Sequence, residues 1–134
     1  MTTAGYSGTP LPRKLGLRDD TRLLLVDAPD DFDPLAPAGA TVHRRPGRSP
    51  YDVVLVFCRD LASLERRFVA LKERIGTAGA LWVAWPKKGS GVRTDLDGNV
   101  VREFGLGAGL VDVKVAAIDA TWSGLKFVYR LVDR

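Results

Sequence analysis

Cysteine and histidine are nearly missing from this sequence, which has one of each, Cys58 and His43, among 134 residues. An intramolecular disulfide needs two cysteines and a zinc site of cysteine and histidine needs three or four ligands, so we expect neither. We also expect no other metal site, although one acidic turn considered below offers oxygen ligands. Cys58 lies in an apolar run beside Arg59. The positive neighbour favours a reactive thiolate and burial favours an inert thiol, so the sequence leaves both open.

Long apolar runs and a strong charge imbalance are missing too. No run approaches the roughly 18 residues that span a membrane, and the glycine-rich start lacks the apolar core of a secretory signal. We therefore expect a cytoplasmic protein with no membrane contact. Twenty Lys and Arg against sixteen Asp and Glu leave a net charge of +4, spread along the chain. Such a mild charge leaves nucleic-acid binding as a secondary possibility.

What the sequence does contain is enough apolar surface for one core. Its length and its 46% of hydrophobic residues fit a single domain. Residues 1–20 are rich in glycine and proline, which predicts an extended N-terminal arm that packs on the domain through Leu15 and Leu17. Residues 21–134 then form one α/β domain.

Unbroken apolar runs predict buried strands at residues 22–29, 51–58 and 80–85, with a weaker strand at 40–44. Between the second and third of these, Asp60 is a candidate N-cap for a helix. An apolar stripe then follows at helical spacing, and Gly76 and Gly79 are expected to end the helix. The stripe consists of Leu61, Leu64, Phe68, Leu71 and Ile75.

The sequence of the second half of the domain predicts a helix and a hairpin. Thr94 and Asp97 have capping-box spacing before a helix that runs to about residue 108. Apolar segments at 111–118 and 125–132 suit an antiparallel hairpin whose last strand is open to pairing in a homodimer. The expected fold is a three-layer Rossmann-like α/β sheet of about six strands, mostly parallel and ending in that hairpin.

Two resemblances follow from these features. The element order, with its terminal hairpin, is similar to that of class I methyltransferases, which bind S-adenosylmethionine after their first strand. Four segments together resemble an uncharacterised bacterial family of short proteins, a domain of unknown function, and this resemblance implies kinship without an activity. The segments are residues 4–11, 85–88, 109–114 and 122–128.

The strongest candidate site is the basic turn, residues 85–91, which follows the strand at 80–85. Ligands of parallel α/β sheets bind beyond the carboxyl ends of strands, and glycines let backbone N–H groups curl around an anion. Trp85 at the strand end offers a stacking face, and the next helix starts nearby. The candidate anion-binding residues are Trp85, Lys87, Lys88, Gly89, Ser90, Gly91 and Thr94.

The turn after the first strand is a weaker candidate. A methyltransferase-like cofactor turn needs glycines, but residues 26–32 contain Pro29 and three aspartates and no glycine. We therefore expect no S-adenosylmethionine site and no other evident cofactor. Four aspartates between residues 27 and 33 offer magnesium ligands, although a solvated acidic turn is the simpler interpretation.

The function that best fits these features is a noncatalytic or degenerate methyltransferase-like domain that binds a small anionic ligand or a protein partner. One alternative is a small enzyme in which Lys87 or Lys88 polarises a substrate and Asp95 or Asp27 acts as the base. Another is a weak nucleic-acid-binding protein, with an arginine cluster as the contact and Tyr51 stacking on a base. That cluster is Arg44, Arg45 and Arg48.

Overall fold

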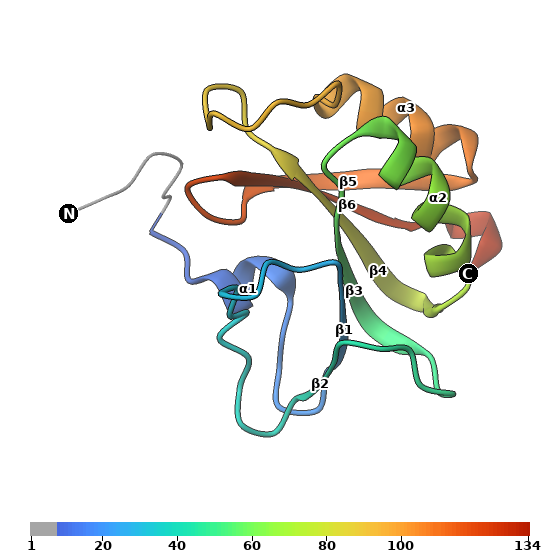
Figure 1. The fold of residues 1–134 in the computed structure, drawn as a ribbon. Coiled ribbons are helices and arrows are strands. Elements are labelled where there is room, and N and C mark those ends of the chain that lie inside the picture. Colours follow the sequence, from blue (N-terminus) through green and yellow to red (C-terminus); the bar gives the residue numbers. More distant parts are fainter. Residues whose placement is uncertain (1–7) are drawn as a thin grey trace.

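A computed structural model describes residues 8–134, which form one six-stranded sheet with helices on both faces (Figure 1). The strands are β1 (Arg22–Val26), β2 (Thr41–His43), β3 (Tyr51–Phe57), β4 (Ile75–Pro86), β5 (Leu110–Ala117) and β6 (Trp122–Tyr129). The helices are α1 (Leu11–Leu15), α2 (Leu61–Lys72) and α3 (Gly98–Gly107), and a 3-10 turn covers Leu131–Asp133. Residues 1–7 of the expected N-terminal arm lie outside the described part of the chain.

The strand order is β2-β1-β3-β4-β6-β5, and the first four of these strands are parallel. β6 runs antiparallel to both of its neighbours, β4 and β5. The expected six-stranded, mostly parallel sheet with an antiparallel hairpin is confirmed. One expectation is wrong: the last strand is not an edge, because β6 inserts between β4 and β5. The edge at this side is β5, which carries an irregularity between Asp112 and Lys114.

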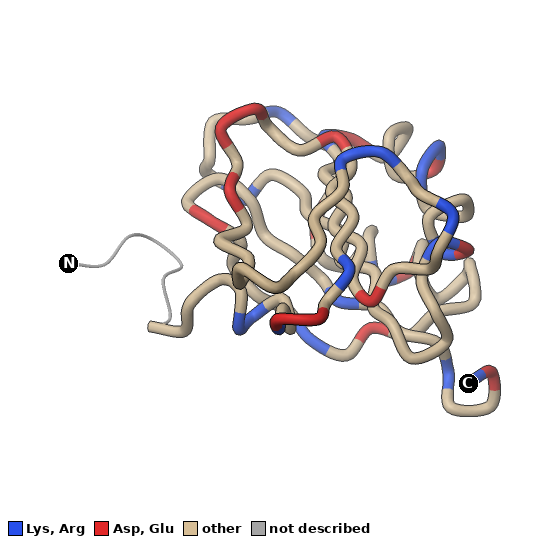
Figure 2. The backbone as a smooth tube through the Cα atoms, turned by 90° about the horizontal axis from the view of Figure 1, so that it is seen from below, with Lys and Arg blue, Asp and Glu red and all other residues tan. Residues whose placement is uncertain are grey.

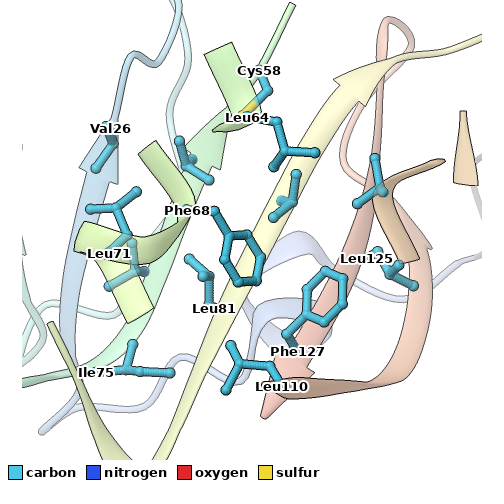
Figure 3. Close-up of a cluster of buried hydrophobic side chains, with 14 of the residues drawn as sticks. Val26, Cys58, Leu64, Phe68, Leu71, Ile75, Leu81, Leu110, Leu125 and Phe127 are labelled. Carbon is cyan, nitrogen blue, oxygen red and sulfur yellow. The ribbon is translucent and has the colours of Figure 1, made fainter. Parts of the chain in front are cut away.

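One face of the sheet is covered by α2 and α3. Leu64, Phe68 and Leu71 of α2 are buried there, as the apolar stripe predicted. The ring of Phe68 lies between α2 and the sheet and makes an edge contact with Phe127 of β6, with 5.5 Å between ring centroids (Figure 3). Val101 and Gly105 of α3 complete this layer.

The predicted end of α2 is wrong. The helix stops at Lys72, and Ile75 is the first residue of β4, where it pairs with Tyr51. The glycines expected to stop the helix therefore lie inside a strand. A Cβ at Gly79 would stand 3.0 Å from the carbonyl oxygens of Tyr51 and Asp52, so a larger residue would crowd the backbone where β4 passes the irregular start of β3.

The N-cap of α2 is confirmed, because the Asp60 carboxylate accepts hydrogen bonds from the backbone N–H and the hydroxyl of Ser63, at 2.8 and 2.7 Å. These bonds hold the pKa of Asp60 below its ordinary value of 3.8. A lowered pKa means that the charged cap stabilises the fold above the unfolded-state pKa and is lost as the pH falls through the folded-state pKa.

We therefore predict that Asp60→Asn, which keeps a capping oxygen but no charge, lowers the melting temperature at neutral pH. The difference from the wild type should shrink as the pH falls below 3.8, the ordinary aspartate value. Thermal unfolding followed by circular dichroism over this range measures it. A difference that stays constant down to the most acidic pH would contradict the account.

The opposite face of the sheet has a thinner cover, made of α1 and loops. Leu15 at the end of α1 and Leu17 beyond it are buried at 1% and 7% exposure. They pack in one cluster with Phe32 from the loop after β1 and Trp122 from the start of β6. Trp82 belongs to the same cluster and is fully buried, as the strand pattern predicted.

The predicted N-cap of α3 is also wrong. Thr94 does not cap it: its hydroxyl oxygen accepts a hydrogen bond from the Leu96 N–H at 3.0 Å within the preceding loop. Asp97 is the N-cap of α3 and accepts from the Val100 N–H at 2.9 Å. The helix thus begins at Gly98, and the loop between the basic turn and α3 is longer than the pattern implied.

Candidate functional site

The carboxyl ends of four strands meet at one rim of the sheet. β1, β3 and β4 are parallel, and β5 shares their direction because both β4 and β5 are antiparallel to β6. Ligands of open α/β sheets bind at this rim. Two cavities, of about 600 and 670 Å³, lie there, on either side of the start of β6.

The smaller cavity, which we call the basic pocket, is formed by the basic turn, the loop before α3 and the first residue of α3. Its lining residues are Trp85, Pro86, Lys87, Lys88, Gly89, Val92, Arg93, Thr94, Leu96, Asp97, Gly98 and Ser123. The structure thus brings Trp85, Lys87, Lys88, Gly89 and Thr94 together around one space. Ser90 and Gly91, the other two predicted residues, belong to the turn but do not line the cavity.

The shape of the turn depends on its glycines. Gly89 and Gly91 have φ angles of 85° and 87°, a region that side chains with a Cβ rarely enter. The Lys87 N–H donates to the Thr121 carbonyl at 2.7 Å, and the Ser90 N–H donates to the Lys87 carbonyl at 3.1 Å. These bonds fix the start of the turn against the β5–β6 connection, so that the two lysines lie at the mouth of the pocket.

Sequence reasoning missed Arg93, which lines the same cavity. Three cationic residues, Lys87, Lys88 and Arg93, therefore surround the basic pocket, with Asp97 as its single acid. One oxygen of Asp97 is used in capping α3. Gly98 brings the positive end of the α3 dipole to the wall. Such a set of donors can bind a phosphate or a carboxylate through charge-assisted hydrogen bonds.

Trp85 lines the basic pocket from the side of the core. Its side chain is only 7% exposed and belongs to the apolar cluster beneath α2 and α3. A Cβ at Gly98 would stand 3.7 Å from Cζ2 of Trp85, so the helix start lies against the ring. Trp85 is thus a wall of the pocket, with most of its ring packed in the core.

The acidic loop after β1 is held by structural contacts. Both oxygens of Asp27 accept from the Arg67 guanidinium, at 2.9 and 3.1 Å. Asp33 accepts from the Leu35 N–H at 2.8 Å. Among residues 8–134, no three Asp, Glu, His or Cys side chains are grouped so that they could hold a metal ion.

The two proposed general bases are engaged in the fold. Asp27 has Arg67 as its partner, and Asp95 accepts from the Leu61 N–H at the first residue of α2, at 2.8 Å. Neither aspartate lines the basic pocket.

Cys58 and His43 are not brought together. Cys58 is fully buried at the end of β3, and burial, with Asp27 and Asp60 nearby, raises its pKa to about 12. Both burial and the raised pKa favour the neutral thiol over the reactive thiolate. His43 is in β2, which β1 separates from β3 in the sheet. Its Nδ1 lies 2.6 Å from the hydroxyl oxygen of Tyr51.

The arginine cluster at residues 44–48 lacks its expected aromatic partner. Tyr51 is 1% exposed, its hydroxyl accepts from the Gly47 N–H at 2.8 Å, and the Arg22 guanidinium lies 4.8 Å from the ring centroid. The prediction that Tyr51 stacks on a base is wrong, because the ring is enclosed by its own loop and strand.

Within the described residues, no helix has the length and apolar character needed to cross a membrane. No protein-family model matches the chain, and a search of curated proteins gave no match.

Proposed function

We propose that this protein is a noncatalytic, methyltransferase-like domain that binds a small anionic ligand in the basic pocket. The observation that carries the proposal is the grouping of Lys87, Lys88 and Arg93 around one cavity of about 600 Å³ at the carboxyl rim of the sheet. This volume lies within the range of roughly 300–1,000 Å³ that is typical of small-molecule sites. The ligand class that fits is a small molecule with a phosphate or carboxylate group.

Each cation contributes a different kind of contact. A guanidinium such as that of Arg93 can donate two parallel hydrogen bonds to a phosphate or carboxylate. The ammonium groups of Lys87 and Lys88 act as point charges with rotatable donors. Lys87 already interacts within the protein. We therefore expect the loss of Lys88 or Arg93 to weaken anion binding more than the loss of Lys87. The side chains of Lys88 and Arg93 are exposed and open to solvent at the rim.

The relation to methyltransferases is supported by the insertion of β6 between β4 and β5 and by the pair of helices that follow β3 and β4. In this proposal, the helical layer on the α1 side of the sheet is smaller than in a Rossmann-like fold, because no helix connects β1 to β2. The turn after β1 disfavours S-adenosylmethionine as a cofactor, since Asp27 is paired with Arg67 and Phe32 is buried in the core. A partner protein on the same rim is the other form of the proposal.

Thermal unfolding in the presence of inorganic pyrophosphate tests the small-ligand form. At ten times its dissociation constant, a bound ligand stabilises the folded state by about 1.4 kcal/mol. For a domain of this size that raises the melting temperature by about 5 °C. Sodium chloride of equal ionic strength should give no such rise. The double variant Lys88→Ala, Arg93→Ala should weaken binding by at least about tenfold.

A matched control is the double variant Arg45→Ala, Arg48→Ala, which removes the same net charge from an exposed loop far along the chain from the pocket. It should bind pyrophosphate as the wild type does. Equal weakening by both double variants would mean that the protein responds to its overall charge, and the basic pocket would lose its role. S-adenosylmethionine, included in the same experiment, should give no shift.

A further inference from the structure

The larger cavity at the rim, of about 670 Å³, lies on the other side of the β6 start and differs in chemistry from the basic pocket. We call it the apolar pocket. Its floor is formed by Phe32, Ile118 and Trp122, which are all at least 92% buried, and Leu11 of α1 and Leu35 of the β1–β2 loop lie at its sides. It thus draws on three segments that are distant in the sequence.

The floor is rigid because three aromatic rings support one another. Phe57, at the end of β3, makes edge contacts with Phe32 and with Trp122, with centroid separations of 4.9 and 5.0 Å. Edge-to-face pairs at such distances are favourable beyond the apolar area they bury. The Arg59 guanidinium carbon lies 6.0 Å from the centroid of Trp122, so one cation already approaches this ring.

The charges around the apolar pocket are mainly negative. Three aspartates line it, Asp31, Asp33 and Asp119, against one lysine, Lys14. The Lys14 ammonium donates to the Ala117 carbonyl at 3.0 Å. Asp33 and Asp119 each use one oxygen on backbone N–H groups of their own turns, at 2.8 to 2.9 Å. The lining residues therefore carry an excess of two negative charges, while two arginines lie behind the floor: Arg59 next to Trp122, and Arg44, which donates to the Phe32 carbonyl.

Leu35 has an unusual conformation for its position. Its φ angle is 56°, in the left-handed region, and its side chain is 61% exposed. A residue with a Cβ in this region costs roughly 1–3 kcal/mol, and a leucine normally offsets such a cost by being buried. Here it is instead at the side of a cavity, where an apolar ligand would cover it.

We propose that the apolar pocket binds an apolar molecule that carries one positive charge, an alkyl- or arylammonium. The hydrocarbon part lies on Phe32, Ile118 and Trp122, next to Leu35. The ammonium group lies among Asp31, Asp33 and Asp119. This ligand class is opposite in charge to that of the basic pocket, so the two sites can be tested separately.

Isothermal titration calorimetry on the full chain tests the proposal with three probes of similar shape: phenethylammonium, phenethyl alcohol and phenylacetate. The cation should bind most tightly and phenylacetate least. Asp31→Asn should weaken binding of the cation by about fivefold and leave the alcohol unchanged. Leu35→Gly relieves the backbone strain, so it should raise the melting temperature while it weakens both the cation and the alcohol.

Two results would overturn the proposal. One is that the cation and the alcohol bind equally, or that neither binds, to a protein whose melting curve is that of the folded wild type. The other is that Asp31→Asn has no effect on the cation. Lys88→Ala, in the basic pocket, is the matched control and should leave phenethylammonium binding unchanged. A loss of cation binding in this control would also contradict separate sites.

Discussion

Gly105→Ala is expected to destabilise the protein by about 3 kcal/mol. A Cβ at this position would overlap with Cε1 of the Phe127 ring and lie 2.7 Å from its Cδ1. The ring cannot move aside easily, because Phe127 is fully buried and its edge contact with Phe68 closes the other side. Alanine therefore forces α3 away from the sheet or Phe127 out of its packing.

Urea unfolding followed by tryptophan fluorescence measures the effect, with Gly107→Ala as the matched control. Gly107 lies two residues further along the same helix, and a Cβ there would have no neighbour within 4 Å. The control should be neutral or stabilise the protein by up to about 1 kcal/mol, because alanine favours a helix. If Gly105→Ala unfolds within about 0.5 kcal/mol of the wild type, the described packing of α3 on β6 is wrong.

The second large effect concerns Cys58, whose thiol should react about a thousandfold more slowly in the folded protein than in the unfolded chain. Burial raises its pKa from 9.0 to about 12, which lowers the thiolate fraction by roughly this factor at mildly alkaline pH. The side chain is also fully buried, so a reagent needs an opening of the fold to reach it.

Labelling with dithiobisnitrobenzoate, compared with and without denaturing urea, measures the two rates. The single cysteine makes the signal unambiguous. Gly105→Ala, if folded, should label faster than the wild type, because a less stable fold opens more often. A folded wild-type rate within about tenfold of the unfolded rate would show that Cys58 is accessible. It would then be a candidate nucleophile after all.

Much of the fold follows from local patterns. The apolar runs predict β1, β3 and most of β4 because parallel strands are buried on both faces. Asp60 and the stripe at Leu64, Phe68 and Leu71 predict α2, because a side-chain N-cap and one apolar face are what stabilise this helix in the fold. The hairpin at the end needs only two strands and a short polar turn.

The errors lie where tertiary contacts override a local pattern. Ile75 continues the spacing of the α2 stripe, but its backbone pairs with Tyr51 in the sheet and the strand begins there. Thr94 has a capping spacing, but Asp97 takes the cap. The insertion of β6 between β4 and β5 is also absent from the sequence pattern, since a hairpin does not specify which of its strands lies at the edge.

The candidate site was predicted in part. Lys87, Lys88 and Gly89 were found because they follow a strand directly, and a strand end at the rim is a local signal. Arg93 was missed because the loop that returns it to the pocket has no periodic pattern. The apolar pocket was missed entirely, because it combines α1, the β1–β2 loop and the β5–β6 turn, and Asp31 and Asp33 were interpreted as part of a solvated acidic turn.

Positive charge is not confined to the basic pocket, so a test of anion binding must distinguish the pocket from the rest of the surface. Lys and Arg positions are interspersed with Asp and Glu positions along the whole chain (Figure 2). Weak, nonspecific binding of a polyanion would therefore spread over several segments, whereas the proposed ligand contacts only the basic pocket. A method that reports on individual residues separates the two cases.

The central claim, that the basic pocket holds an anion, is tested most directly by NMR titration of the isotope-labelled protein with inorganic pyrophosphate. The account predicts saturable shifts of the backbone amides of Lys88, Gly89 and Gly98, and of the Arg93 side chain, at constant ionic strength. Amides of Asp31, in the apolar pocket, should stay in place. Shifts that grow linearly without saturation, or that are larger at residues 44–48 than at the basic turn, would contradict the claim.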